Sequence, residues 1–394
     1  MNEYRPEEGL RVMKVQEVIM RAMSGQINWL EAAEILRWSP RTLRRWRQRY
    51  ERQGYDGLYD RRKKRPSPRR VPLKTAEKVL RLYRESYGGW NVRHFHEKLV
   101  EEHGIKLSYQ WVKCALQTAG LVSQHTRWQK HRQERERRPL RGMLVHVDGS
   151  THAWIPGAGW QPDLMAFLDD ATSEVYAAFF CEEEGTMPVL WGLKTILQEK
   201  GLFCSLYTDR GSHFFHTPEV GGKVDRTRPT QVGRALAQLG IEHIPSYSPQ
   251  ARGRMERFFG TWQGRLPQEL EKAGITTLEA ANEYLKRTFI PWHNRKLAVA
   301  PKEAGSAFVP AGGTDLDAIL CVQEERVVNN DNTVSWGKKK LQIEAQNWRG
   351  SLAKCRVKVC EHLDGSISVR YGPRVVGWYD LEGRPLKEEK RAAA

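Results

Sequence analysis

The sequence predicts a multidomain chain with an all-α N-terminal region, a central α/β domain and a small all-β C-terminal region. At 394 residues the chain exceeds the usual size of one domain. Short helical patterns with single apolar stripes fill its first third, and apolar strands alternate with amphipathic helices in its middle. Residues 314–385 are rich in Val, Ile, Trp and Tyr between turn signals, which predicts a small β-barrel.

The charge balance indicates a polyanionic partner. Lys and Arg number 64 against 47 Asp and Glu, a formal net charge of +17, and such an excess favours nucleic acid. A membrane surface is the alternative, but the sequence contains neither an apolar run of about 18 residues nor a secretory signal. The six cysteines have no zinc-ligand spacing, so we expect reduced thiols, no structural zinc and an intracellular location.

Residues 10–60 contain the first basic helix pair. The stretch "LEAAEILRWSPRTLRRWRQRY" (30–50) has two short apolar stripes, and Ser39 followed by Pro40 begins the second helix as N-cap and first helical residue. Two helices joined by a tight turn predict a helix-turn-helix whose second helix reads DNA. A solvated amphipathic helix is the alternative, although the single sign of the charge favours DNA. The expected DNA contacts are Arg41, Arg44, Arg45, Arg47 and Arg49.

A basic linker and a second helical unit follow. The linker, residues 61–72, is proline-rich and is expected to follow DNA phosphates. Its expected contacts are Arg61, Arg62, Lys63, Lys64 and Arg65. Residues 73–125 predict a second helix-turn-helix or winged-helix DNA-binding domain, with a break at Gly104 and a helix capped by Ser108. The connector at 126–141 is basic and either contacts phosphates or is a plain exposed linker.

Residues 142–310 have the element order β-β-β-α-β-α-β-α. The first strand, within "GMLVHVDGSTHAWI", ends at Asp148, and the fourth, within "LYTDRGSHF", ends at Asp209. A long helix begins in "ARGRMERFFGTWQGRL" (251–266). Three neighbouring strands followed by crossover units predict a mixed sheet flanked by helices, the arrangement of ribonuclease H-like domains.

Three carboxylates are expected to meet at one edge of this sheet. Asp148 and Asp209 end strands that lie side by side in the predicted topology, and Glu256 lies at the margin of the apolar stripe of the following helix. Because three like charges repel unless cations join them, we expect the three acids to bind two Mg²⁺, with Mn²⁺ as a substitute. A plain turn is the alternative for Asp209. Arg252 and Arg254, just before Glu256, are expected to face a nucleic-acid phosphate or to form surface salt bridges.

Other polar residues nearby have ordinary interpretations. Asp169 and Asp170 predict a hairpin turn, and Glu182 to Glu184 predict a solvated strand end. His146 and His213 flank the predicted acids, and packing or surface placement is the common state of a lone histidine. A direct role for any of them is the minor alternative.

The ordered set "VHVDGSTHAW", "FLDDATSEV", "YTDRGSHF", "TQVGRALAQLGIEHIPSYSPQARGRMERFFGTWQGRL" and "HNRKLAVAP" resembles the DDE-type transposases of the retroviral-integrase superfamily, and most closely the ISNCY group of bacterial insertion sequences. The resemblance covers residues 25–310 and implies a catalytic triad of Asp148, Asp209 and Glu256, with 60 residues between the first pair and 46 between the second. The segment 216–229 lengthens the second interval relative to retroviral integrases.

The resemblance also implies a function. Such a protein binds the terminal inverted repeats of a mobile element, hydrolyses a phosphodiester at each end and joins the freed 3′-hydroxyl to target DNA, without a covalent protein–DNA intermediate. It would act as at least a dimer on DNA in the bacterial cytoplasm, associated with the nucleoid, and would use no small-molecule substrate. The alternatives are a domesticated, non-catalytic DNA-binding repressor and a ribonuclease H-like nuclease or Holliday-junction resolvase that cleaves without strand transfer.

Overall fold

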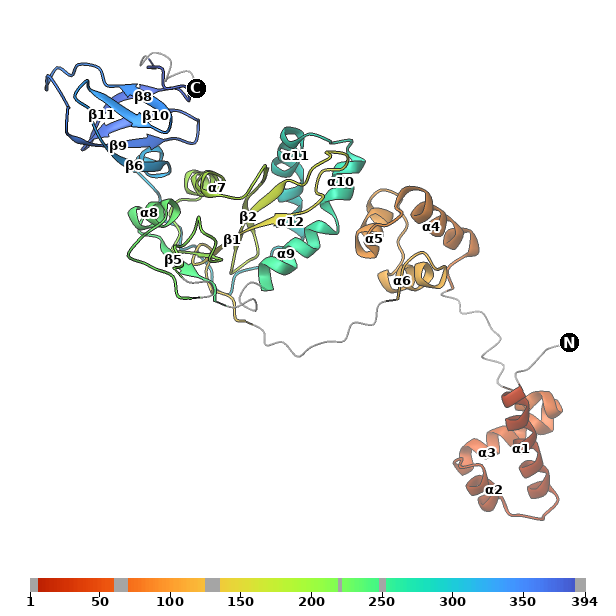
Figure 1. Cartoon of the computed structure of the whole chain (residues 1–394). Coiled ribbons are helices and arrows are strands. Elements are labelled where there is room, and N and C mark those ends of the chain that lie inside the picture. Colours follow the sequence, from red (N-terminus) through yellow and green to blue (C-terminus); the bar gives the residue numbers. More distant parts are fainter. Residues whose placement is uncertain (1–5, 60–69, 125–134, 219–221, 248–252, 387–394) are drawn as a thin grey trace. The chain divides into compact units, whose positions relative to one another are not determined.

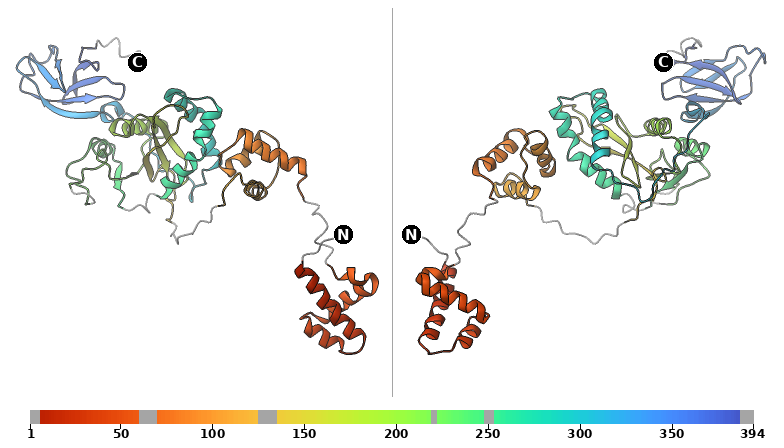
Figure 2. Two further views of the ribbon diagram at one scale, coloured as in Figure 1. Left: turned by 45° about the vertical axis from the view of Figure 1, so that its right-hand side comes forward. Right: turned by 180° about the vertical axis from the view of Figure 1, so that it is seen from behind.

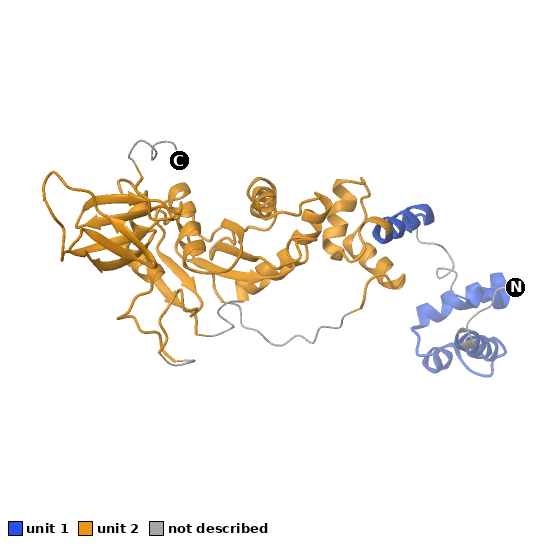
Figure 3. Ribbon diagram, turned by 45° about the horizontal axis from the view of Figure 1, so that its top comes forward, with its two compact units in different colours: residues 1–84 blue, residues 85–394 orange. Residues whose placement is uncertain are grey.

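The chain contains two compact units. The computed structural model describes residues 6–59, 70–124, 135–218, 222–247 and 253–386. The units comprise residues 1–84 and 85–394 (Figure 3). The predicted linker contacts at 61–65 lie outside the described residues.

The first unit is helical. Its elements are α1 (Pro6–Met23), α2 (Trp29–Ile35), α3 (Pro40–Gln53), the short 3-10 helix η1 (Gly54–Leu58) and most of α4 (Leu73–Ser86). The side chain of Asn28 caps α2, and the Ser39 hydroxyl accepts a hydrogen bond from the Thr42 N–H at 3.2 Å at the start of α3. Ile19 and Leu43 are fully buried where α1, α2 and α3 pack together. The predicted helical N-terminal region is therefore confirmed.

The second unit begins with two helices and continues into the central sheet. Its helices are α5 (Val92–Glu101), α6 (Tyr109–Thr118), α7 (Thr186–Glu199), α8 (Gln231–Gln238), α9 (Gly253–Gln263), α10 (Leu266–Lys272), α11 (Leu278–Tyr284), the π-helical turn η4 (Leu285–Phe289), α12 (Ile290–Lys296) and α13 (Leu316–Ile319). Its strands are β1 (Val145–Thr151), β2 (Asp163–Asp169), β3 (Val175–Cys181), β4 (Ser205–Thr208), β5 (Glu242–Pro245), β6 (Val322–Val327), β7 (Thr333–Trp336), β8 (Lys339–Gln342), β9 (Arg356–Glu361), β10 (Ile367–Tyr371) and β11 (Arg374–Tyr379). Across the described parts of both units, no helix has the length and apolar character needed to cross a membrane.

The central sheet is mixed, as predicted. Its strands lie in the order β3-β2-β1-β4-β5 (Figure 1). β1 pairs antiparallel with β2, and β2 pairs antiparallel with β3. β1 pairs parallel with β4, and β4 pairs parallel with β5. This is the ribonuclease H-like arrangement expected from the element order. The antiparallel neighbours follow one another directly in the chain, and the chain enters the parallel strands β4 and β5 after the helices α7 and α8.

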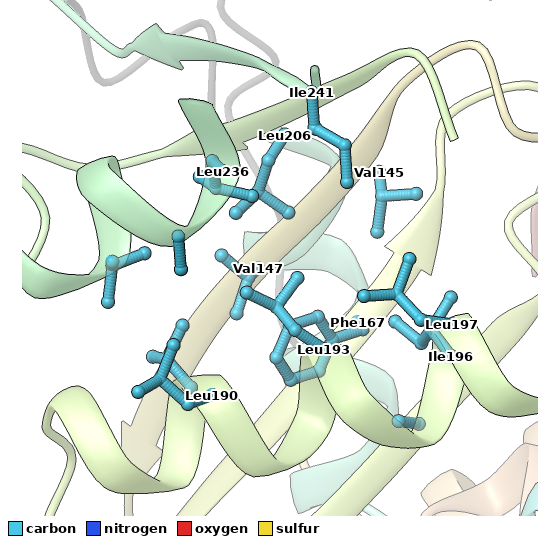
Figure 4. Close-up of a cluster of buried hydrophobic side chains, with 14 of the residues drawn as sticks. Val145, Val147, Phe167, Leu190, Leu193, Ile196, Leu197, Leu206, Leu236 and Ile241 are labelled. Atoms are coloured by element: carbon cyan, nitrogen blue, oxygen red, sulfur yellow. The ribbon is translucent and has the colours of Figure 1, made fainter. Parts of the chain in front are cut away.

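Helices cover both faces of this sheet (Figures 1 and 2). On one face Val145, Val147 and Leu206 pack against leucines and isoleucines of α7 and α8 (Figure 4). On the other face the alternate strand residues pack against the apolar stripe of α9 and against α10 to α12. The sheet therefore has a core on each side, which explains why β2 and β3 are buried almost throughout.

Two asparagine side chains satisfy the open edge of β3. Asn282 of α11 accepts a hydrogen bond from the Phe180 N–H at 2.6 Å and donates to the Phe180 carbonyl at 3.0 Å. Asn294 of α12 does the same for Val175, at 2.8 and 2.9 Å. An amide side chain offers one donor and one acceptor, as a neighbouring strand would. These contacts fix α11 and α12 to the edge of the sheet and protect that edge from pairing with another strand.

The C-terminal region differs from the predicted barrel. Its described strands form a four-stranded antiparallel sheet in the order β11-β10-β9-β6 and a separate β7-β8 hairpin. Val334, Leu341, Val359 and Val369 share one buried core between these two sheets. The apolar alternation predicted the strands and the common core, but it carries no information on whether the last strand pairs with the first, and closure of a barrel depends on that pairing.

Helices α5 and α10 are joined by charged contacts. The His94 Nε2 lies 2.6 Å from Glu269 Oε1, and the Lys98 ammonium lies 2.8 Å from the same oxygen. Arg265 donates to both carboxylate oxygens of Glu97 at 2.7 and 3.0 Å. Burial alone would raise the pKa of Glu269. The hydrogen bonds from His94 and Lys98 lower it by more, so the pKa of Glu269 falls to about 2. The face of α5 that bears these residues is therefore used to hold the helix against α10.

We expect Gly192→Ala to lower the free energy of unfolding by about 1–2 kcal/mol. A Cβ on this residue of α7 would overlap the buried ring of Phe167. This overpacking outweighs the gain in helix propensity from alanine. The matched control is Gly260→Ala in α9, where no atom lies within 4 Å of an added Cβ. This control should raise stability by up to about 1 kcal/mol. Urea denaturation followed by tryptophan fluorescence measures both changes, and equal effects would contradict the packing argument.

We expect the stability contributed by Glu269 to depend on acid pH. Because its pKa falls from 4.5 to about 2 in the folded chain, the contribution is complete above pH 4.5 and is lost as the pH decreases toward 2. The difference in unfolding free energy between the wild type and Glu269→Gln should then shrink by up to about 3 kcal/mol across this window. Glu271→Gln, at an exposed position just beyond in the same helix, is the control. If the difference in unfolding free energy between the wild type and Glu269→Gln does not change with pH, the pKa of Glu269 is not lowered in the folded chain.

Candidate functional site

The parallel pairing of β1 and β4 sets the level of the first two predicted acids. Val145 pairs with Leu206 and His146 pairs with Tyr207. Asp148 lies two residues beyond His146, and Asp209 lies two residues beyond Tyr207. The same register therefore brings Asp148 and Asp209 to the same level of the sheet. Asp209 directly follows the last residue of β4, as predicted. The prediction that the first strand ends at Asp148 is wrong, because β1 continues to Thr151 through its pairing with β2 and Asp148 lies in the middle of the strand.

Asp148 belongs to the face of the sheet that α9 covers. Its cross-strand partner on β2 is Ala166, which lies in the core formed with α9 to α12. Val145 and Val147 belong to the opposite core. Because side chains alternate along a strand, His146 and Asp148 share the α9 face, and the rings of His146 and Tyr207 meet there at 5.2 Å.

Glu256 lies in the first turn of α9 and is exposed. Its neighbour Met255 and the aromatic residues Phe258 and Trp262 are buried against the sheet, so the apolar stripe predicted for this helix is confirmed. Within the described residues, no group of three or more His, Cys, Asp or Glu side chains is close enough to hold a metal ion. The complete site of three acids therefore stays a prediction.

The stretch after β4 is a true turn as well as a candidate ligand position. The Gly211 N–H donates to Asp209 Oδ1 at 2.9 Å, and the Thr208 hydroxyl donates to the Asp209 carbonyl at 2.8 Å. Arg210 donates to the Gly222 carbonyl at 2.7 Å, which ties the segment at 216–229 to this turn. The turn chemistry predicted for Asp209 thus fixes the backbone beside its carboxylate.

Glu184 and His213 lie closer to the predicted site than the sequence suggested. The His213 Nε2 lies 3.3 Å from Glu184 Oε1, and a side chain at Gly149 would collide with the Glu184 carboxylate. Glu184 is therefore next to the residue that follows Asp148, and it is only partly exposed. The run of three glutamates resembles a solvated strand end, and no sequence signal distinguishes its third member.

Asp170 contacts several residues that lie far from it in the chain. It is fully buried, whereas the sequence predicted only a hairpin turn at this position. The His146 Nε2 lies 2.7 Å from its Oδ1, the Arg138 N–H donates to its Oδ2 at 2.7 Å, and the Arg254 Nε lies 3.1 Å from its Oδ1. The adjacent Asp169, also buried, accepts hydrogen bonds from the N–H groups of Gly142 and Thr172 and is the residue that closes the hairpin.

The Asp170 carboxylate is ionised despite its burial. Burial alone would raise its pKa. The hydrogen bonds from His146 and the Arg138 N–H lower it by more, so the pKa of Asp170 falls to about 2. Burial lowers the pKa of His146, so its imidazole is neutral at neutral pH and donates through Nε2. The guanidinium groups of Arg254 and Arg135 then balance the buried negative charge.

This arrangement corrects the expectation for Arg254. Only 8% of the residue is exposed, and besides Asp170 it donates to the backbone carbonyls of Asp170 and Arg135 at 2.9 and 3.0 Å. The salt bridge foreseen as the alternative to a phosphate contact is present, but in the interior rather than at the surface. Arg252 lies outside the described residues.

The arginines of the basic helix α3 differ in their exposure and in their contacts within the unit. Arg41, Arg44, Arg45 and Arg49 are exposed, and Arg47 is partly exposed. Arg47 lies 2.7 Å from Glu51 and over the ring of Trp29, and the Arg49 guanidinium lies 5.1 Å from the ring of Trp46. The first three arginines are thus the better candidates for DNA contact, and they lie at the N-terminal end of the predicted recognition helix.

Family models match the helical region. A homeodomain-like helix-turn-helix model matches residues 42–116, and a helix-turn-helix domain model matches residues 16–67. These matches cover the α3 segment and reach into the second predicted helix-turn-helix. They confirm the helix-turn-helix character of the N-terminal region.

Two solved structures of retroviral integrases are similar at a low level. The magnesium-bound catalytic core domain of the HTLV-2 integrase is 15% identical, covers 42% of this chain and 94% of its own, and has a TM-score of 0.30. The intasome of simian T-cell lymphotropic virus in complex with a PP2A regulatory subunit is 13% identical, covers 79% of this chain and 99% of its own, and has a TM-score of 0.33.

Curated relatives match nearly the whole chain. A protein of Sinorhizobium fredii, named as a transposase, is 29% identical over 90% of this chain and 78% of its own. The transposase for insertion sequence IS1202 of Streptococcus pneumoniae is 27% identical over 91% of this chain and 84% of its own. Membership of the ISNCY group stays a prediction. Along about nine tenths of its length, the chain is thus similar to two proteins named as transposases, one of them the transposase of an insertion sequence.

Proposed function

We propose that the protein is a DDE transposase that cuts DNA at the ends of an insertion sequence and joins those ends to target DNA. The observation that carries the proposal is the register of β1 and β4, since it puts Asp148 and Asp209 at one level of the sheet. Asp148 shares its face with α9, the helix that bears Glu256. The sequence similarity to proteins named as transposases supports DNA transposition as the reaction.

The donor set suits a hard divalent cation. Asp148, Asp209 and Glu256 offer only carboxylate oxygens, which are the ligands that Mg²⁺ prefers, and Mn²⁺ accepts the same oxygens. Two bound Mg²⁺ would activate the attacking oxygen and stabilise the leaving one. The carboxylates would hold the metal, and the hydrogen bond from the Gly211 N–H would orient Asp209 for this task.

The chemistry would proceed without a covalent protein–DNA intermediate. Water attacks the phosphodiester at the element end, the bond to the 3′-oxygen breaks, and a 3′-hydroxyl is released. That hydroxyl then attacks a phosphodiester of target DNA and displaces a new 3′-hydroxyl, so one phosphodiester forms for each one broken. Two element ends must be held together for paired joining, so the active form would be at least a dimer on DNA, acting on nucleoid DNA in the bacterial cytoplasm.

DNA recognition would fall to the helix-turn-helix region. Helix α3 would enter the major groove of the terminal inverted repeats, with Arg41, Arg44 and Arg45 on the DNA side. The net charge of +17 would add a general attraction to phosphate. The linker arginines and lysines at 61–65 would extend this contact along the backbone of the DNA.

We expect Asp209→Asn to abolish metal-dependent nicking of a donor plasmid that carries the native element ends, by several orders of magnitude, because a neutral amide cannot replace a metal-binding carboxylate. The assay compares Mg²⁺ with EDTA and scores nicks and joined products. Glu183→Gln, an exposed acid of the same domain, is the control and should keep wild-type activity. Sequence-specific end binding without cleavage by the wild type would indicate the repressor instead, and nicking without joining would indicate the nuclease.

We expect the double variant Arg44→Ala, Arg45→Ala to bind end DNA more weakly and with a smaller salt dependence. Each lost phosphate contact should reduce the slope of log K against log salt by about 0.9. Fluorescence anisotropy with end DNA over a range of salt concentrations measures this slope. Arg11→Ala, an exposed arginine of α1, is the control. A double variant with the wild-type slope would exclude the N-terminal half of α3 from the interface.

A further inference from the structure

The residues two positions before the three proposed catalytic acids all belong to one cluster, in which His146 and Arg254 are buried and Tyr207 is partly exposed. These residues are His146 before Asp148, Tyr207 before Asp209 and Arg254 before Glu256. They come from three elements, β1, β4 and α9. No sequence pattern connects them, and none of them is among the proposed metal ligands.

Asp170 is the centre of this cluster, and two of the three residues contact it directly. The His146 Nε2 lies 2.7 Å from Asp170 Oδ1, and the Arg254 Nε lies 3.1 Å from the same oxygen. Arg254 also donates through Nη1 to the Asp170 backbone carbonyl at 2.9 Å. One residue of the β2–β3 hairpin therefore fixes both the strand that bears Asp148 and the helix that bears Glu256.

Tyr207 joins the cluster through its ring. The Tyr207 and His146 rings lie 5.2 Å apart at 69°, an edge-to-face contact. The guanidinium of Arg135 lies 5.4 Å from the Tyr207 ring, and its Nη2 lies 3.5 Å from Asp170 Oδ1. The strand that leads into Asp209 is thus held to Asp170 through His146 on one side and through Arg135 on the other.

The spacing of two residues has a different meaning in each element. In a strand, residues i and i+2 lie on the same face, so a contact at His146 or Tyr207 controls the height and tilt of the backbone that presents the following acid. In a helix, residues i and i+2 point to nearly opposite sides. Arg254 is therefore buried against Asp170 while Glu256 is exposed, and the contact fixes the rotation of α9 about its axis.

We propose that Asp170 is a positioning residue that sets the mutual placement of the three catalytic acids. It would do so through His146, Tyr207 and Arg254, without contacting metal or DNA itself. The inference rests on the proposed function, because it assigns a role relative to those three acids. A purely structural role for Asp170 is the competing explanation, and it predicts lower stability with unchanged metal binding in the folded protein.

The test is the binding of Mn²⁺ by the full chain in complex with end DNA, followed by electron paramagnetic resonance, together with the rate of end nicking at increasing Mg²⁺. We expect Asp170→Asn, which keeps the shape of the side chain and removes its charge, to weaken Mn²⁺ binding by about tenfold or more and to raise the Mg²⁺ needed for nicking by a similar factor. Binding of end DNA should stay at the wild-type level, since α3 lies in the other unit.

Two further variants separate positioning from stability. Glu269→Gln removes a carboxylate that also lies at the centre of a charged cluster, but on α10, and its ion-pair partners His94 and Lys98 lie on α5. It should lose stability and keep the wild-type affinity for Mn²⁺. Arg254→Lys keeps the positive charge and loses the planar fork that reaches both Asp170 and the Arg135 carbonyl. It should weaken Mn²⁺ binding as Asp170→Asn does, and it serves as the test if Asp170→Asn does not fold.

Wild-type affinity for Mn²⁺ in Arg254→Lys and in the folded fraction of Asp170→Asn would overturn the inference while leaving the proposed function intact. The same loss of Mn²⁺ affinity in Glu269→Gln would also overturn it, since any destabilised cluster would then have this effect. Nicking by the wild type that resists EDTA, or a wild type that binds no Mn²⁺, would refute the proposed function first and the positioning role with it.

Discussion

The parallel pairing of β1 with β4 is the contact on which the rest of the central domain depends. It joins segments about sixty residues apart in the chain, and its register decides which residues of the two strands share a level and a face. A shift of one residue would move Asp148 or Asp209 to the face covered by α7 and α8. The cores on the two faces oppose such a shift, because Val145, Val147 and Leu206 would then leave their apolar surroundings.

A buried charge reinforces this register. The Asp170 carboxylate has no exposed surface, and its ionised state is stabilised by a histidine on β1, a backbone N–H of the connector and an arginine on α9. Removing Arg254 would leave the buried charge with only the weaker contact from Arg135, and removing His146 would leave a carboxylate lone pair without its donor; each change costs more in the interior than the loss of a surface ion pair. Such a cluster favours one arrangement of the strand, the hairpin and the helix over near alternatives.

Helices α3 and α5 use charge in different ways. In α3 the arginines Arg41, Arg44 and Arg45 face outward, where repulsion between them is relieved by a polyanion. In α5 the charged residues pair with α10 across the second unit, through His94, Lys98 and Glu269. A basic composition therefore indicates the kind of partner, whereas the pairing of individual side chains decides which surfaces remain open to it.

The sequence by itself determined the order of strands and helices, the helix caps at Ser39 and Ser108 and the position of Asp209 just after a strand, because local periodicity, capping and turn chemistry depend on neighbouring residues. The continuation of β1 past Asp148 to Thr151 depends instead on pairing with β2. Only the tertiary structure determined that Arg254 and Asp170, which lie 84 positions apart in the chain, form a buried ion pair. The same holds for Asn282 on the edge of β3 and for the two open sheets in place of a barrel. Each of these depends on a partner far away in the chain, and no local pattern records which partner will be within reach.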